Sequence, residues 1–429
     1  MTQRVGGIAR SFNWLVVRLR KMVDQLLLIL GPLMYNVGIF WDKTSGVCDL
    51  MRVAVLQENL AKALSIAGRA VENRPIQPVL SNILLRADDA RLQVAAINMG
   101  LGLSISTWIG AKVETEGDIT LPARTLTDLV NNLANERVDL TLDANTQTMN
   151  IRCGTTVSNI KGISAEEFPI LPEGGGGDVA IPGKVLRDMI NQTVFAAAKE
   201  DNRPILTGVY TLFEGNTLTM AAADGYRLAV RTAEIERNFA EPLELVIPAR
   251  ALAEVARIIS DDDSEVLFSL PDDRNMVMFN IGNTDVSTNL LEGKFPDFAA
   301  IIPKNYSTAT VMYTTDLLRA CKRAEIFARD SSDSAKLFVQ PASGPGEPGA
   351  VRIVGQSAER GDNEGLLDAS VEGEGVDISF NIKYLIEVLN VIPDERVVFE
   401  SSGATNPGVI RPENRDDFIH VIMPMSTGR

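Results

Sequence analysis

Apolar residues recur at helical spacing in six separate stretches of the chain. In the clearest stretch, Leu252, Val255, Ala256 and Ile259 stand at positions i, i+3, i+4 and i+7. This spacing places them on one face of a helix. Arg250 precedes the leucine by two residues, which is about 200° around a helix from it. The pattern therefore predicts a helix with a buried apolar side and a basic side that faces solvent.

The same pattern begins at five other leucines. The leading leucines are separated by 60 to 68 residues and are Leu60, Leu126, Leu186, Leu252, Leu317 and Leu385. Each has a basic residue two positions away, and these residues are Lys62, Arg124, Lys184, Arg250, Arg319 and Lys383. A period this steady indicates an internal repeat.

The charge of the expected helices differs in sign from that of the rest of the chain. The helices together hold 13 Lys and Arg against 7 Asp and Glu, over residues 57–71, 122–134, 183–199, 248–260, 314–329 and 381–392. The whole chain has a formal net charge of −15. Basic helices within an acidic protein indicate a segregated surface that faces a polyanion.

The segments between the helices predict strands, most of them joined in hairpins. Alternating β-type runs flank turn residues at 138–142 with 148–151, 209–213 with 217–220, 266–270 with 276–281, and 336–340 with 351–355. Two helix-and-hairpin units make one domain, which predicts an α+β fold of three similar domains, each with two helices packed on mainly antiparallel sheet. We expect these domains at 51–177, 178–306 and 307–429, with the glycine run 174–177 as a flexible joint.

The residue types that catalysis most often needs are scarce. Cys48, Cys153 and Cys321 are odd in number and lack C-x-x-C spacing, which argues against a disulfide scaffold and a zinc site and fits a reducing compartment. His420 is the only histidine, and we expect it to lie in a strand. The acidic residues show no spacing suited to a two-metal nuclease. We therefore expect no catalytic residues, no metal and no cofactor.

Residues 1–50 lack the repeat. Arg18, Arg20 and Lys21 precede an uncharged apolar run from Gln25 to Trp41. Such a run is typical of a signal peptide or a membrane anchor, and it gives the alternative function of a membrane-associated interaction protein. Against this, Gly31-Pro32 interrupts a run that is short for a membrane span. We prefer a dispensable extension or a start codon placed too early.

From Met51 to Met425 the chain resembles the bacterial sliding clamp family, the beta subunit of DNA polymerase III. The resemblance depends on five motifs in order, at 223–230 (Ala-Asp-Gly-Tyr-Arg-Leu-Ala-Val), 293–298, 302–305, 380–384 and 421–425. It implies a homodimeric, head-to-tail ring that encircles duplex DNA without sequence specificity. Such a ring confers processivity on the replicative polymerase in the cytoplasm, and it has no catalytic activity of its own.

The resemblance also implies a pocket that receives a short peptide, of the Gln-Leu-x-Leu-Phe type, from polymerases, the clamp loader and repair polymerases. Carried over by motif, the pocket comprises Leu206, Gly225, Tyr226, Arg227, Leu228, Pro296, Ile301, Tyr384, Val421, Met423, Pro424 and Met425. Arg227 is expected to fix a polar group of the peptide, whereas Leu228 and Val421 are equally consistent with ordinary core residues. Tyr226 stands where many members have histidine, Ala300 where a basic residue is common, and the tail differs.

Two further sets of residues complete the expected surfaces. The DNA-binding set combines bases of the repeated helices with bases of two loops that touch DNA in the family: Arg74, Lys184, Lys199, Arg203, Arg250 and Lys383. An open series of domains leaves two sheet edges unpaired, a state that proteins avoid. We therefore expect domains one and three to meet in a dimer with the help of Ile160, Ile326 and Phe327.

Overall fold

The computed structural model describes residues 51–425 except for residues 73, 173–178, 201, 261–264, 272–274 and 345–346. The N-terminal extension, the glycine run 174–177, the acidic run 261–263 and the tail 426–429 lie outside the described residues. Residues from Asp49 onward form one compact unit.

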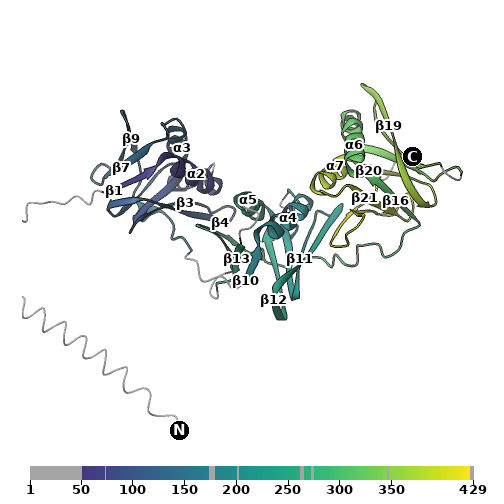
Figure 1. Cartoon of the computed structure of the whole chain (residues 1–429), viewed down its shortest axis with the longest axis horizontal. Helices are drawn as coiled ribbons and strands as arrows, with labels where there is room; N and C mark the ends of the chain where they lie inside the picture. Colours follow the sequence, from purple (N-terminus) through teal and green to yellow (C-terminus); the bar gives the residue numbers. More distant parts are fainter. Residues whose placement is uncertain are drawn as a thin grey trace, which may run out of the picture. The chain divides into compact units, whose positions relative to one another are not determined.

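All six helices expected from the repeat are present. They are α2 (Gln57–Ala67), α3 (Ala123–Asn131), α4 (Gly183–Thr193), α5 (Ala249–Ile258), α6 (Thr314–Ala328) and α7 (Ile382–Val391). The leading leucine of each is buried and the accompanying base of each is exposed. Figure 1 shows the helices in neighbouring pairs, α2 with α3, α4 with α5 and α6 with α7.

Proline ends the strand before three of these helices. Pro122, Pro182 and Pro248 are the N-cap residues of α3, α4 and α5, with φ of −53°, −55° and −52°. The ring fixes φ near this value, so it directs the chain out of the strand and into the helix. At α7 the side chain of Asn381 caps the helix by accepting a hydrogen bond from the N–H of Lys383 at 3.0 Å.

The strands form three sheets in which every pairing is antiparallel. The five-stranded sheet has the order β5 (Lys112–Thr115), β1 (Arg52–Leu56), β7 (Arg137–Asp143), β8 (Thr148–Cys153) and β9 (Thr156–Lys161). The eight-stranded sheet has the order β10 (Val179–Pro182), β13 (Glu265–Ser269), β14 (Met276–Ile281), β15 (Thr284–Asn289), β4 (Leu103–Gly110), β3 (Arg91–Asn98), β2 (Asn82–Asp88) and β6 (Gly117–Pro122).

The ten-stranded sheet is the largest. Its order is β11 (Gly208–Ala223), β12 (Arg227–Pro248), β23 (Phe418–Ile422), β22 (Gly408–Pro412), β21 (Arg396–Ser401), β16 (Thr308–Tyr313), β19 (Gly361–Gly373), β18 (Gly349–Ser357), β17 (Ser334–Gln340) and β20 (Val376–Asn381). The fold class predicted from the sequence is therefore confirmed, because each pair of helices accompanies antiparallel sheet.

Two sheets continue from one expected domain into the next. β4 pairs with β15, with Leu103 opposite Thr288 and Thr107 opposite Thr284. β12 pairs with β23, with Leu228 opposite Val421. We call these the first and second junctions. Each joins strands that are more than 170 residues apart in the sequence, so backbone hydrogen bonds hold the domains together.

One of the four predicted hairpins is wrong. Residues 209–213 and 217–220 belong to a single strand, β11, whose partner along this length is β12. The turn-type residues Glu214 to Asn216 form an irregularity in this pairing, and Gly215 takes a φ of +57° there. A glycine at positive φ makes a bulge inside a strand as readily as a turn. The other three hairpins are confirmed.

Cys153 and Cys321 are buried and unbridged. Within the part of the chain that the structure describes, no helix is long and apolar enough to cross a membrane.

Candidate functional site

The residues expected to form the pocket gather around the second junction. Leu206, Leu228 and Val421 are buried there, at 4%, 1% and 1% exposure. They pack in a small apolar core with Phe295 and Val230, separate from the main core. We call this set of buried residues the junction cluster. The interpretation of Leu228 and Val421 as core residues therefore fits their surroundings.

Large apolar side chains remain exposed beside the junction cluster. Tyr226, Ile301 and Met423 expose 66%, 42% and 41% of their surface. The backbone N–H of Met423 donates to the carbonyl of Tyr226 at 2.8 Å. Farther along the tail, the N–H of Met425 donates to the carbonyl of Ser379 in β20 at 2.8 Å. The C-terminal residues thus bind both the second domain and the third.

A tight turn carries Tyr226 outward. The Asp224 carboxylate accepts hydrogen bonds from the N–H groups of Tyr226 at 2.9 Å and Arg227 at 3.1 Å. Gly225 has a φ of +93°, a conformation that favours glycine. The Nη1 atom of Arg203 lies 3.9 Å from where a Cβ at Gly225 would stand. Arg203 therefore lies beside this turn, and its expected contact with DNA stays a prediction.

The side chain of Arg227 is only 2% exposed. Its Nε donates to Asp224 at 3.0 Å, its Nη2 donates to the carbonyl of Phe195 at 2.6 Å, and its Nη1 is paired with Glu387 of α7. The guanidinium also lies 4.2 Å from the ring centroid of Tyr384. Three of its N–H groups donate to Asp224, Glu387 and Phe195, and these contacts tie the second domain to the third. That Arg227 fixes a polar group of a peptide stays a prediction.

Sequence reasoning missed the acceptors of Arg227. Asp224 lies in the same motif as Arg227, whereas Glu387 and the Phe195 carbonyl come from other parts of the chain. Of those two, Glu387 carried a signal. It stands two residues after a leading leucine, as Glu254 does in α5. The phenol of Tyr384 is affected by the same network. Burial, followed by the Asp224 charge, raises the pKa of Tyr384, while the Arg227 charge opposes that rise.

His420 lies in β23 as expected, opposite Ala229, and is fully buried. Burial, reinforced by the positive charge of Arg227, lowers the pKa of His420 to about 3. The imidazole is thus neutral at physiological pH and packs against the Phe195 ring, with 5.2 Å between centroids. A backbone hydrogen bond with Leu228 opposes this lowering of the pKa.

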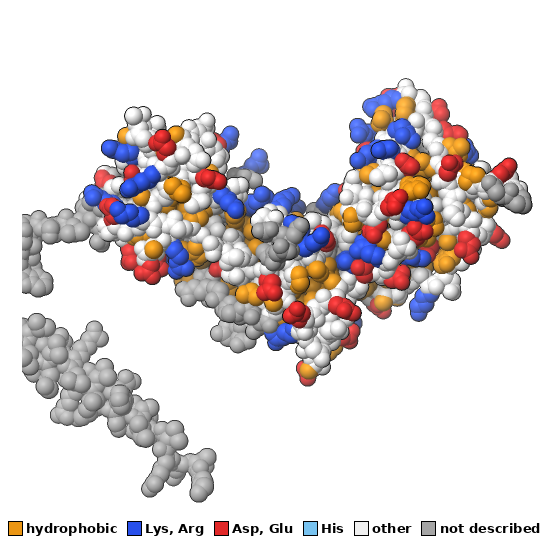
Figure 2. Space-filling model, in the orientation of Figure 1, with side chains coloured by type: hydrophobic (Ala, Val, Ile, Leu, Met, Phe, Trp, Pro, Cys, Tyr) orange, Lys and Arg blue, Asp and Glu red, His pale blue; other side chains and the backbone are white. Residues whose placement is uncertain are grey.

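All six residues expected to bind DNA are exposed. Two of them have acidic neighbours, because Lys383 lies 2.8 Å from Asp333 and Lys199 lies 3.7 Å from Glu387. Figure 2 shows Lys and Arg side chains gathered over α4 and α5 and over α6. The helices that the sequence predicts to be basic thus expose their Lys and Arg side chains, because the apolar side of each helix is buried.

The residues expected at a dimer interface lie near two open sheet edges. Ile160, in the edge strand β9, is 7% exposed, while Ile326 of α6 is 52% exposed and Phe327 is half-buried. Two further apolar residues were missed. Val157 on β9 is 49% exposed, and Leu366, in the half of β19 that pairs only with β18, is 66% exposed. An apolar residue at an outward-facing position of an edge strand is the signal that could have indicated Val157 and Leu366.

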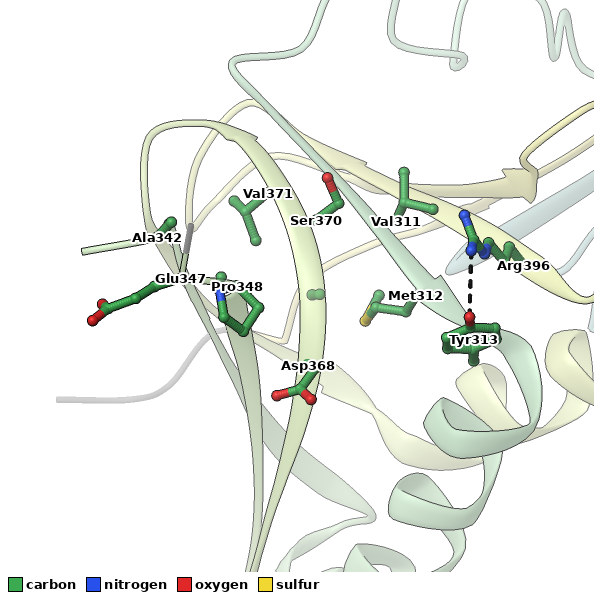
Figure 3. Close-up of a pocket in the computed structure, with 12 residues that line it drawn as sticks. Val311, Met312, Tyr313, Ala342, Glu347, Pro348, Asp368, Ser370, Val371 and Arg396 are labelled. Atoms are coloured by element: carbon green, nitrogen blue, oxygen red, sulfur yellow. Dashed lines mark hydrogen bonds between the residues drawn. The ribbon is translucent and has the colours of Figure 1, made fainter. Parts of the chain in front are cut away.

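Two other features carry none of the predicted site residues. A cavity of about 370 Å³ lies where β19 changes partner from β18 to β16, and there Arg396 donates to the Tyr313 hydroxyl at 3.3 Å (Figure 3). Asp88, Asp89 and Glu116 place carboxylate oxygens within 4.8 Å of one another. All three are exposed in the described structure, and we assign the group no role.

Comparison with known proteins agrees with this architecture. Three family models match in order: the N-terminal domain of the DNA polymerase III beta subunit over residues 51–172, the central domain over 180–297 and the C-terminal domain over 299–426. The chain belongs to the DNA polymerase III beta subunit family. It is a sliding clamp by fold and by family.

Individual relatives support the same assignment. The beta sliding clamp of Synechocystis is 30% identical over 394 residues, covering 87% of this chain and 99% of the relative. That of Synechococcus elongatus is 29% identical, with the same coverage. The crystal structure of the Bacillus subtilis DNA polymerase sliding clamp matches with a TM-score of 0.81 at 29% identity, covering 88% of this chain and 100% of that one.

Proposed function

We propose that two copies of this chain close into a ring around duplex DNA and hold the replicative polymerase on its template. Repetition of one strand pairing is the observation that carries the proposal. β4 joins the last strand of the second domain, and β12 joins the last strand of the third. The corresponding strands without such a partner in the described structure are β19 of the third domain, whose residues 361–369 pair only with β18, and the edge strand β9 at the end of the first.

In such a ring, β19 of each copy would pair with β9 of the other. Both joints between the copies would then use the same strand pairing as the two internal junctions. The apolar residues already on these edges suit this pairing, since Val157 and Leu366 are both exposed. A heterologous contact of this kind forms a closed ring when its rotation returns to the first copy. Edge strands that pair in this way also cease to be sites of aggregation.

The basic helices supply the contact with DNA in this proposal. Lys184, Arg250 and Lys383 are exposed basic side chains at one position of the repeat. In this proposal each contacts DNA phosphates and does not read the nucleobases. Phosphate contacts position a protein without specifying sequence, and they weaken with salt. Such contacts suit a ring that must slide.

The exposed apolar group at the second junction would receive the peptide of a polymerase, clamp loader or repair polymerase. Tyr226, Ile301 and Met423 offer adaptable apolar surface, and Arg203 stands at its edge as a charge available to the peptide. Arg227 would act as a positioning residue through its contacts with both domains.

Retention on DNA tests the ring directly. Protein loaded onto nicked circular duplex by a bacterial clamp loader should stay bound through gel filtration in high salt, and cutting the circle once should release it. A ring is held by topology, so salt alone should not remove it from the circle. Equal loss from circular and linear DNA would rule out encirclement.

A further inference from the structure

Each internal junction contains an ion pair between one domain and the next. At the first junction, Arg69 in the short helix η1 (Gly68–Ala70) lies 3.2 Å from Glu254 of α5. At the second junction, Arg227 pairs with Glu387 of α7. In both cases the cation belongs to the preceding domain and the carboxylate to the second helix of the following domain. The junctions therefore share an electrostatic contact as well as a strand pairing.

The two carboxylates occupy the same position of the repeat. Glu254 follows Leu252 by two residues, and Glu387 follows Leu385 by two. The corresponding residue of the first domain is Asp128, two after Leu126. Asp128 is 70% exposed, and its ion pair in the described structure is with Arg124 of its own helix at 3.8 Å. Within the described structure, no cation from a neighbouring domain pairs with Asp128 as Arg69 and Arg227 do at the other two positions.

The third domain offers a cation at the matching place. Arg360 is 58% exposed, and its Nε lies 3.2 Å from Asp330 in η6 (Arg329–Ser331), the short helix directly after α6. Arg227 likewise contacts η4 (Val194–Ala196), the short helix directly after α4, through the Phe195 carbonyl. Both arginines also lie at the hairpin turn that leads into the strand used for joining, β19 or β12.

We infer that Arg360 of one protomer pairs with Asp128 of its partner across each subunit joint. The inference rests on the proposed ring, and it names the groups that select the second copy of this chain. An exposed ion pair contributes little binding energy, about 0 to 1 kcal/mol. Complementary charges nevertheless fix register and discriminate between partners. The pair would therefore act mainly on specificity.

Charge reversal on the full-length chain tests the pair. Asp128→Arg places two cations at each joint, and Arg360→Asp places two carboxylates there. Since a dimer has two joints, each variant alone should dimerise about tenfold more weakly, a change equal to about 0.7 kcal/mol at each joint. The matched control is Glu114→Arg on β5, the edge strand at the opposite side of the same sheet. It should leave the dimer dissociation constant unchanged.

Mixing the two variants gives the sharper result. In a mixed dimer both joints again join an arginine to an aspartate, whereas both kinds of self-dimer join like charges. Native mass spectrometry of an equimolar mixture should therefore find mixed dimers in clear excess over the statistical half. A statistical mixture, or single variants that dimerise like the wild type, would overturn the inference and leave the ring intact. A wild-type chain that stays monomeric at micromolar concentration would instead overturn the proposed ring.

Discussion

The two internal junctions use the same antiparallel strand pairing with different chemistry around it. At the first junction, hydroxyl groups meet across the boundary, with 2.6 Å between the Oγ atoms of Ser104 and Ser287. Thr284 also donates to Thr107 at 2.9 Å. At the second junction the apolar junction cluster and the buried Arg227 take their place.

This difference shows how one repeated joint can acquire a second task. The hydroxyl pairs of the first junction satisfy one another across the boundary. The second junction has apolar side chains on its outer surface, with a buried charge network holding the two domains in place behind them. A peptide site needs both an apolar surface and a fixed shape, and the second junction combines them. The following predictions are ordered by their expected effect on the free energy of unfolding.

Removing Arg227 should have the largest effect. Arg227→Ala leaves Asp224 and Glu387 without their shared cation, and breaking a buried pair in this way costs about 3 kcal/mol. The matched change at the first junction, Arg69→Ala, removes a pair whose arginine side chain is one-third exposed, and it should cost below about 1 kcal/mol. Urea unfolding of both variants measures the contrast. Equal losses would mean that the two junctions do not differ as described.

Acid should weaken the second junction before the first. The pKa of His420 is lowered to about 3 in the folded chain from an ordinary value of 6.5, so the unfolded chain binds the proton more tightly. Stability should therefore be complete above pH 6.5 and decline as the pH falls toward 3, by about 2 kcal/mol at pH 5 from this group.

The variant His420→Phe should remove that contribution. Comparing the unfolding free energies of wild type and variant at pH 7 and pH 5 isolates it from other acid effects. Hydrogen-exchange protection factors, corrected for the slower intrinsic exchange in acid, should also fall more between pH 7 and pH 5 in β12 and β23 than in β4 and β15. If wild type and variant lose the same stability on acidification, His420 is not the group responsible.

Ser104→Ala probes the first junction with a smaller change. It leaves the buried Ser287 hydroxyl without its partner, which should cost about 1 kcal/mol. Replacing both serines with alanine should restore part of the loss, because no orphaned hydroxyl remains. A double variant as unstable as the sum of both single changes would show that these hydroxyls do not act as a pair. Thermal unfolding of the three variants decides it.

Deleting residues 423–429 should change stability least, since Met423 and Met425 are held mainly by single backbone hydrogen bonds. We expect a loss below about 1 kcal/mol, with dimerisation retained. Binding of a Gln-Leu-x-Leu-Phe type peptide should nevertheless fall by more than tenfold. Melting temperature and peptide affinity, measured on the same sample, separate these effects. A large drop in melting temperature with binding retained by the folded fraction would mean that the tail only seals the third domain.

The helices could be predicted from the sequence because each carries its signal within about two turns. Burial of Leu60, Leu186 or Leu385 follows from spacing alone. The false hairpin at Glu214 shows where local signals fail, since glycine at positive φ serves a bulge and a turn equally. Turn chemistry cannot distinguish the two unless the partner strand is known.

The site was harder to predict because its decisive contacts join distant segments. Arginine in a motif is normally exposed and available, so nothing near Arg227 signals that it is buried. Its acceptors lie 3, 32 and 160 residues away. Arg203 was assigned to DNA from its loop, whereas its guanidinium lies at the Gly225 turn. Such placements depend on how strands of different domains pair, and no local pattern encodes that pairing.

Sheets that continue across domain boundaries have a mechanical consequence. The segment from 290 to 307 that links the second and third domains contains no strand, whereas the β12 and β23 ladder joins the same two domains through backbone hydrogen bonds. A bending force applied to the chain would therefore twist this ladder as an elastic ribbon. Stiffness would depend on the number of rungs at each junction, and lengthening the linker would leave it unchanged.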